Sequence, residues 1–400
     1  MKVGKADKDG DFVEEKVWSP LELAEMKTGR RAGQIRRAKG FSGRKRVRVT
    51  DCTACYHVMS RVVNGEFLLG TIEKEALRRI MWRMARFSGV EILTYAIMDN
   101  HFHILLKVPE KKKWLQRFEG ENGEEKLFEH LSLVYSKTFI GQLRREISEM
   151  RARDEEDYAQ ALLDRFKQRF CDLSLFVKEL KERFSRWYNK QNSRRGTLWM
   201  DRFKSVLVEK GGALQTMAAY IDLNPVRAGI VEDPAMYQWS GYGEAVGGSK
   251  RARRGLCKVL GVPQDGWGTK AHAYYRRWLY GEGLVADEGG QDEPVEGGPS
   301  ARNSPMGGKR KRRKGFTKEQ MQAAVGDHFA LPMLHLRKRV RSFSEGIALG
   351  SEDYVKGVAA KYREQFARQK ERKVKPLKGL NAGTAGCRAG SIFVMRDSGG

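Results

Sequence analysis

The side chains best suited to chemistry are two histidines that stand two residues apart, His101 and His103. They follow the turn pair Asp99-Asn100, which has an apolar run rich in β-branched residues on either side. Two such runs around a turn pair predict a tight β-hairpin. Because side chains alternate faces along a strand, the two imidazoles are expected on one face of the second strand.

Two imidazoles on one face can chelate a single metal ion. A histidine pKa near ~6.5 leaves most of the side chain neutral at cellular pH, and the neutral ring is the form that binds a metal. The spacing of His101 and His103 does not supply a third ligand, however. From these residues alone, two histidines that merely begin an amphipathic strand remain the alternative.

A second reactive group lies in a short apolar helix predicted from Ala213 to about Leu223, which the pair Asn224-Pro225 ends. Tyr220 and Asn224 are four residues apart and therefore lie on one face, one turn apart. A tyrosine near a metal site, beside an amide oxygen that can bind the metal, suggests covalent catalysis by a phenolate. A tyrosine packed in the core is the alternative for Tyr220.

The composition favours a polyanionic partner. The chain has 76 basic and 50 acidic residues among 400, a formal charge of +26. Nucleic acid is the first candidate partner and a membrane surface the second. No apolar run reaches the ~20 residues of a membrane-spanning helix, and the first residues lack the apolar stretch of a signal peptide. The five scattered cysteines favour a reducing cytoplasm.

The elements that must hold these residues follow the order strand, helix, strand, strand, helix, strand. This order predicts an α+β fold, a ferredoxin-like four-stranded antiparallel sheet with helices. Helical patches between residues 110 and 170 indicate an insertion, and a small helical module is predicted near the C-terminus. The expected core segments are strand 56–63, a helix from Thr71 to Gly89, the hairpin 93–108, helix 173–189 and strand 198–209.

Three motifs together carry a resemblance to a known family. They are His101-Phe-His103 on a sheet strand, the helix Tyr220-x-x-x-Asn-Pro-Val-Arg-Ala-Gly229, and Tyr237-Gln-Trp-Ser-Gly-Tyr242. The chain resembles the HUH single-tyrosine transposases, the insertion sequence 200-like family, and most closely their REP-associated branch. The resemblance covers about residues 56–245. Two further segments fit the family pattern, Gly196-Thr-Leu-Trp199 and Arg202-Phe-Lys-Ser205.

The resemblance implies a role for each motif residue. His101 and His103 match the metal-binding pair, Tyr220 the nucleophile, and Asn224 the residue that completes the metal site. The tyrosine oxygen would attack a DNA phosphorus and leave a 5′-phosphotyrosine link and a 3′-hydroxyl. A site of imidazole nitrogens and an amide oxygen suits Mg²⁺ or Mn²⁺, and zinc stays open. Single-stranded or hairpin DNA is the expected substrate, because unpaired DNA reaches such a site more easily.

Composition and resemblance together divide the chain into four parts. Residues 1–50 are expected to form a basic N-terminal arm and residues 51–246 the transposase-like catalytic domain with its helical insertion. Residues 247–315 are predicted to form a charged, glycine-rich linker with one small helical patch at Ala271–Leu279 and the basic run Lys309–Lys314. Residues 316–400 are expected to form the small helical module, with helical segments at 316–327 and 351–370, and a tail. The insertion and the C-terminal extension depart from the minimal family domain.

Four basic residues are candidates for phosphate contacts, namely Arg61, Arg202, Lys204 and Arg227. Ordinary surface charge is the alternative for each of them. The expected location is a bacterial-type cytoplasm in association with the nucleoid, without a membrane partner. The sequence leaves the oligomeric state open, a homodimer included, and with it whether the tyrosine acts in its own subunit.

Two other functions compete with an active transposase. One is a catalytically silent DNA-binding protein that recognises hairpin repeats. The other is a metal-dependent phosphodiesterase that uses water in place of Tyr220. The active enzyme is the hypothesis that uses every motif residue.

Overall fold

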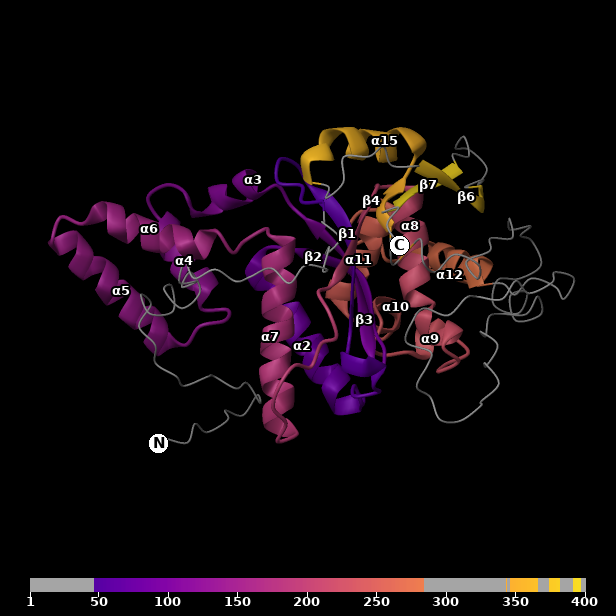
Figure 1. Cartoon of the computed structure of the whole chain (residues 1–400), viewed down its shortest axis with the longest axis horizontal. Coiled ribbons are helices and arrows are strands. Elements are labelled where there is room, and N and C mark those ends of the chain that lie inside the picture. Colours follow the sequence, from indigo (N-terminus) through magenta and orange to yellow (C-terminus); the bar gives the residue numbers. More distant parts are fainter. Residues whose placement is uncertain (1–46, 284–342, 344–345, 366–373, 382–390, 397–400) are drawn as a thin grey trace, which may run out of the picture. The chain divides into compact units, whose positions relative to one another are not determined.

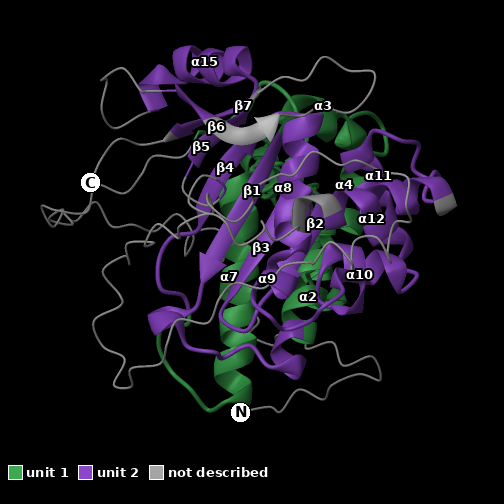
Figure 2. Ribbon diagram, turned by 90° about the vertical axis from the view of Figure 1, so that its right-hand side faces the viewer, with its two compact units in different colours: residues 1–54, 75–91, 107–198 green, residues 55–74, 92–106, 199–400 purple. Residues whose placement is uncertain are grey.

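A computed structural model of the chain describes residues 47–283, 343, 346–365, 374–381 and 391–396 (Figure 1). Most of the predicted basic arm, the basic run Lys309–Lys314 and a helix expected at 316–327 lie outside these residues. The chain forms two compact units, which Figure 2 colours separately. Unit 1 comprises residues 1–54, 75–91 and 107–198, and unit 2 comprises residues 55–74, 92–106 and 199–400. Every predicted site residue belongs to unit 2.

The strands form one mixed sheet in the order β2-β3-β1-β4-β5-β7-β6. β1 and β4 pair antiparallel, with His57 opposite Val206. β4 and β5 run parallel, and β7 is antiparallel to both β5 and β6. The strands are β1 (Ala54–Arg61), β2 (Glu91–Ile97), β3 (His101–Val108), β4 (Lys204–Val208), β5 (Gly346–Gly350), β6 (Val374–Asn381) and β7 (Ser391–Arg396).

The sheet is larger than the sequence predicts, with seven strands in place of four and one parallel pair. The three extra strands come from residues 346–396, where the sequence predicts only helix and tail. α15 (Glu352–Lys361) does lie in the predicted helical segment 351–370. β5 is only five residues long, and β6 contains Pro376 and Gly379, so neither has a strong strand pattern. Their register depends on partners that are distant in sequence.

Unit 1 is mainly helical and includes the predicted insertion. Asp172 caps α7 by accepting a hydrogen bond from the Leu175 amide, as expected of an N-cap aspartate. The buried pair Arg169–Glu179 lies against Phe87, with the guanidinium 4.7 Å from the ring centroid. The helices are α2 (Thr71–Ser88), whose first turn belongs to unit 2, α3 (Lys111–Leu115), α4 (Gly123–Leu131), α5 (Lys137–Ala152), α6 (Glu156–Lys167) and α7 (Leu173–Gln191).

Two helices of unit 2, α11 (Lys250–Leu260) and α12 (Thr269–Gly283), lie in the first part of the predicted linker at 247–315, and α12 covers the helical patch predicted there. α11 has a glycine and five basic residues, which resemble a linker, yet it buries Ala252, Leu256 and Val259 at helical spacing. Gly255 is required there, because a Cβ would lie 2.4 Å from the carbonyl oxygen of Leu93. The helices are α8 (Gly212–Asp222), α9 (Asn224–Arg227), α10 (Gly241–Val246), α11 (Lys250–Leu260) and α12 (Thr269–Gly283).

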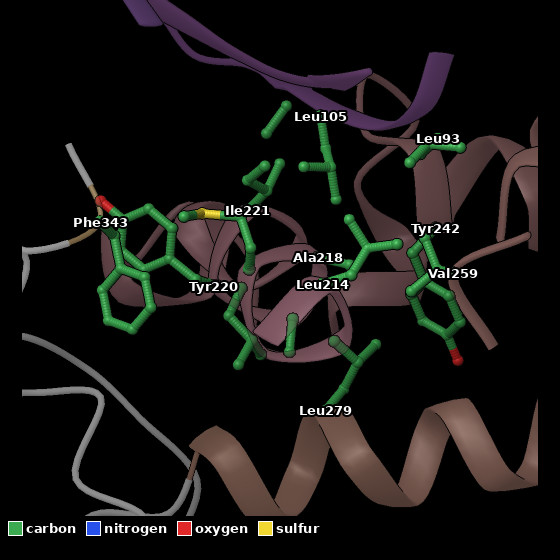
Figure 3. Close-up of a cluster of buried hydrophobic side chains, with 14 of the residues drawn as sticks. Leu93, Leu105, Leu214, Ala218, Tyr220, Ile221, Tyr242, Val259, Leu279 and Phe343 are labelled. Carbon is green, nitrogen blue, oxygen red and sulfur yellow. The ribbon is translucent and has the colours of Figure 1, made fainter. Parts of the chain in front are cut away.

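α8 lies within a large cluster of buried hydrophobic side chains in unit 2 (Figure 3). Leu93 and Leu105 of the hairpin contribute to this cluster, as does Leu279 of α12. The carboxylate of Asp222 fixes the end of α8 by accepting hydrogen bonds from the Thr94 and Tyr275 hydroxyls and from a backbone amide. The helix that carries Tyr220 is therefore firmly held. Among the described residues, none of the helices combines the length and apolarity needed to cross a bilayer.

Candidate active site

The histidine pair lies where the hairpin prediction puts it. β2 and β3 are neighbours, and the Met98 amide donates to the His101 carbonyl at 2.8 Å, which closes the turn. The ring centroids of His101 and His103 are 5.0 Å apart. Phe102 points away from them and packs edge-on against Trp199, with centroids 5.4 Å apart. The alternation along β3 thus brings both imidazoles to one face.

The turn before the histidines is held on both sides. The side-chain amide of Asn100 donates to the Gly65 carbonyl at 2.9 Å, and its oxygen lies 2.6 Å from Nδ1 of His101. Lys74 forms an ion pair with Asp99. Because the Asn100 nitrogen is bound to a carbonyl, its oxygen is the acceptor, and Nδ1 of His101 must carry the proton. The remaining nitrogen of His101, Nε2, keeps its lone pair.

A third histidine, His57 of β1, joins the pair and is one that sequence reasoning missed. Its Nε2 lies 2.8 Å from Nδ1 of His103, and the two rings are stacked with centroids 5.0 Å apart. Its Nδ1 lies 2.7 Å from the carbonyl oxygen of Phe343. The alternating pattern of strand 56–63 is visible in the sequence, but only the adjacency of β1 and β3 shows that His57 faces His103.

Tyr220 of α8 lies beside these rings. Its ring centroid is 5.8 Å from that of His103 and 6.0 Å from that of His57, both in edge-on contact. The ring of Phe343 stacks on it, with centroids 4.7 Å apart (Figure 3). The Arg227 guanidinium lies 5.0 Å from the tyrosine ring centroid. The side chain is 1% exposed, so a phosphate group can reach it only if its surroundings move.

Asn224 is the first residue of α9, and its side chain hydrogen-bonds to the last turn of α8. Its amide nitrogen donates to the carbonyl of Tyr220 at 2.8 Å and to that of Ile221 at 3.3 Å. These bonds use the donor end of the side chain and leave the oxygen, Oδ1, as the available acceptor. The side chain is half-buried. One residue thus secures the helix that carries Tyr220 and keeps an oxygen that can bind a cation.

The three histidines are held in the neutral form. Burial lowers the pKa of His57 to about 4, although the Phe343 carbonyl raises it. Burial and then the charge of Arg61 lower the pKa of His101 to about 4, against the opposing charge of Asp99. Burial, and then the charges of the neighbouring histidines and arginines, hold the pKa of His103 well below its usual value. Neutral imidazoles are competent to bind a metal.

The four candidates for DNA contact divide into two groups. Arg61, at the end of β1, and Arg227, after α8, lie close enough to His103 to lower its pKa by their charge. Arg202 and Lys204 are exposed at the start of β4, where Lys204 is paired with Met59 of β1. The first two are thus beside the histidines, whereas the other two lie along the neighbouring strand.

The donor atoms of this site suit a divalent cation. The other nitrogen of each histidine and the amide nitrogen of Asn224 are used in hydrogen bonds, so the acceptors at hand are Nε2 of His101, Nε2 of His103 and Oδ1 of Asn224. Two nitrogens and one amide oxygen are ligands that Mg²⁺ or Mn²⁺ accepts. In the described part of the chain, no three histidine, cysteine, aspartate or glutamate side chains form a group that could hold a metal. A site here depends on the asparagine.

The chain is similar to known proteins over part of its length. One solved structure, "Structure of the REP associates tyrosine transposase bound to a REP hairpin", covers 56% of this chain and 90% of its own, with 17% identity and a TM-score of 0.32. No curated protein matches the chain. Residues 50–121 match the family described as "Transposase IS200 like". These residues carry β1 and the histidine hairpin, and the family they match is the one that the sequence motifs resemble.

Proposed function

We propose that the chain is a transposase of the REP-associated branch that nicks and rejoins single-stranded or hairpin DNA through Tyr220. One observation carries the proposal: the Tyr220 ring lies 5.8 Å from His103 and 5.0 Å from the Arg227 guanidinium. A nucleophile, a pair of neutral imidazoles and a cation thus meet within one compact unit. Ordinary packing does not require this combination of groups.

The proposed reaction transfers a DNA phosphate to the tyrosine. The Tyr220 oxygen, once it has lost its proton, forms a bond to phosphorus. The bond between phosphorus and the 3′-oxygen breaks, and that oxygen leaves as a hydroxyl after it takes up a proton. The DNA stays attached through a 5′-phosphotyrosine, and attack by a 3′-hydroxyl reverses the step without ATP. An unperturbed tyrosine has a pKa near ~10 and is therefore mostly protonated at neutral pH. A positive charge nearby, here that of Arg227, favours the phenolate.

His101, His103 and Asn224 are the proposed holders of a divalent ion, Mg²⁺ or Mn²⁺. When bound, such an ion polarises a non-bridging phosphate oxygen and orients the phosphate. The protein's own contribution is to keep both imidazoles neutral by burial and to leave a lone pair on Nε2 of each ring, and on the asparagine oxygen, which would hold the ion. Asn224 also couples this oxygen to the end of the helix that carries the nucleophile.

The DNA path is proposed to run over the basic residues near the site. Arg61 and Arg227 lie at the histidines, and Arg202 and Lys204 extend the charge along β4. Contacts with phosphates add affinity without sequence choice. The formal charge of +26 agrees with a nucleic-acid partner. A cytoplasmic, nucleoid-associated location follows from this partner.

The proposed architecture has a ferredoxin-like centre and a tyrosine that acts in its own subunit. The first four strands have the order β2-β3-β1-β4, with helices α2 and α7 between them in the sequence. This order supports a ferredoxin-like centre, which β5, β7 and β6 would extend. Tyr220 and the histidines of the same chain are in ring contact, so the proposed reaction does not require the tyrosine of a partner subunit.

A catalytically silent DNA-binding protein is the second candidate. Tyr220 is 1% exposed and stacked on Phe343, so its oxygen is protected from solvent. A protein that only recognises hairpin repeats would tolerate this burial, whereas the proposed enzyme must open when DNA binds. The two functions differ in whether a covalent link forms.

A denaturing gel separates the candidates. The full-length protein is incubated with an end-labelled single-stranded hairpin oligonucleotide and Mn²⁺. We expect a protein–DNA adduct that survives denaturation. A band retarded only on a native gel would instead support the silent DNA-binding protein. Cleaved DNA without an adduct would indicate a phosphodiesterase that uses water.

A further inference from the structure

We infer that His57 is a positioning residue that holds His103 in the tautomer whose Nε2 can bind the metal, and that the Phe343 carbonyl in turn fixes His57. The inference rests on the proposed function for its metal, but the hydrogen bonds that carry it are present without one. It assigns a role to two residues outside the proposed ligands. One of them, Phe343, lies far from the family match at residues 50–121.

The hydrogen-bond chain starts at the carbonyl of Phe343. A carbonyl oxygen accepts hydrogen bonds and cannot donate them, so the proton between Phe343 and His57 must be on Nδ1 of His57. In a neutral ring the other nitrogen, Nε2, is then an acceptor. This acceptor lies 2.8 Å from Nδ1 of His103, which must therefore carry a proton. In neutral His103, Nε2 keeps its lone pair.

The burial of all three groups makes this arrangement specific. His57 is 1% exposed and His103 is 2% exposed, and Phe343 is fully buried. Water cannot easily replace a partner at such depth, and a buried polar atom that loses its partner costs free energy. Burial also disfavours a charged ring at His57, which would otherwise donate from both nitrogens. The tautomer of His103 is thus set by its neighbours.

His101 is held in the same tautomer, with its proton on Nδ1, by its neighbour Asn100. The Asn100 oxygen receives the proton of its Nδ1, and the Gly65 carbonyl fixes the orientation of Asn100. Both histidines of the pair therefore keep Nε2 for a ligand, through two unrelated sets of bonds. Metal-binding histidines commonly donate their other N–H to a protein acceptor, and loss of that acceptor costs about 10- to 100-fold in metal affinity.

The first test reads the tautomer directly in the metal-free protein. Full-length protein with ¹⁵N-labelled histidine is examined by two-bond ¹H–¹⁵N correlation, and the His103 signals are assigned from their loss in His103→Ala. We expect a protonated Nδ1 and an unprotonated Nε2 at His103. A protonated Nε2 at His103 in the wild-type protein would overturn the inference, and this reading needs no variant at residue 57.

The second test measures Mn²⁺ affinity by calorimetry without DNA. His57→Ala is expected to weaken binding about 10- to 100-fold, because His103 loses its acceptor. His57→Gln should restore much of the affinity, since its side-chain oxygen can accept the His103 proton. His272→Ala is the control: it removes a different histidine of unit 2, a partly buried one that contacts Tyr242, and should leave the affinity unchanged.

The outcomes separate this inference from the proposed function. Unchanged Mn²⁺ affinity in His57→Ala, while His103→Ala loses it, would overturn the positioning role and leave the metal site in place. Unchanged affinity in His103→Ala would overturn the proposed metal site itself. The tautomer of His103 in the metal-free protein would still decide the hydrogen-bonding role of His57. A loss in His57→Ala that His57→Gln restores supports both.

Discussion

Tyr220 differs from an ordinary core tyrosine in its surroundings, since two histidines and an arginine contact its ring. Tyr220→Phe removes the oxygen and keeps the ring that packs against Phe343. We expect the covalent adduct to be abolished while hairpin affinity stays within about twofold of wild type, because no DNA-binding group is changed. The denaturing gel and a fluorescence anisotropy titration measure the two effects. An adduct that persists would assign the nucleophile to another residue, with Tyr242 and Tyr188 examined next.

The histidine pair should be separable from the stability of the fold. The double variant His101→Ala with His103→Ala is expected to lose Mn²⁺-dependent cleavage and to stay folded. It also leaves Nε2 of His57 without its partner, a cost of about 1–3 kcal/mol in unfolding free energy. Urea unfolding with and without Mn²⁺ provides the measurement.

Two results bear on the alternative in which the histidines are only core residues. A collapse of the fold in the double variant, with no effect of Mn²⁺ on wild-type unfolding, would support that alternative. Under the proposed function, Mn²⁺ stabilises the wild-type protein and not the variant, because a ligand that binds only the folded state raises its stability.

The residues of the site divide by how far apart their partners lie in sequence. His101, His103, Tyr220 and Asn224 are visible in the sequence, because strand alternation and helix spacing are local properties. The contact between the histidines and Tyr220 could be expected only from the family resemblance. His57 could not be assigned to the site, since its partners are 46 and 286 residues away. No local pattern encodes such pairs.

The sequence separation of partners also explains which helices and strands the sequence predicts. The hairpin and α8 have strong local patterns and were predicted close to their observed bounds. α11 was missed because its charges and Gly255 suggest a linker, although a neighbouring backbone requires the glycine. β5 pairs in parallel with β4, which lies about 140 residues earlier in the chain, and only the whole fold determines that partner. The domain limits drawn from composition stay a prediction.

Glu244 of α10 joins two elements of unit 2 through a carboxylate that should be sensitive to acid. It accepts a hydrogen bond from Tyr95 of β2 at 2.6 Å and pairs with Arg251 of α11 at 2.9 Å. Burial alone would raise the pKa of Glu244, but these partners outweigh burial and lower the pKa below its usual value of 4.5. The charged form is therefore the one that stabilises the fold.

The lowered pKa of Glu244 determines how stability should change with pH. Because the folded state holds this proton less tightly than the unfolded state, the contribution of Glu244 is present above about pH 5 and is lost as the pH falls below 4.5. Glu244→Gln should be less stable than wild type near pH 7, and the difference should shrink toward pH 3. Urea unfolding at several pH values measures it. A difference that is constant with pH would contradict the role of the charge.

At the scale of the whole molecule, net charge is the property that follows most directly from the sequence. The chain has a formal charge of +26, and six of its basic residues form the uninterrupted run Lys309–Lys314. This run lies outside the described residues, so its role is argued from composition alone. Like charges in such a run repel one another, which favours contact with solvent or with a polyanion. A linker that touches nothing is the alternative.

Replacing all six residues Lys309–Lys314 with glutamine tests whether this run contacts DNA. Contacts with phosphates release counterions and carry no sequence information, so affinity should fall about equally for every single-stranded oligonucleotide. The slope of log affinity against log salt should flatten by up to ~0.7 for each lost contact, while the choice of cleavage site stays the same. A control in which the three lysines of the run become arginine keeps the charge and should bind like wild type. Affinity and salt slope both unchanged in the glutamine variant would establish that the run does not touch DNA.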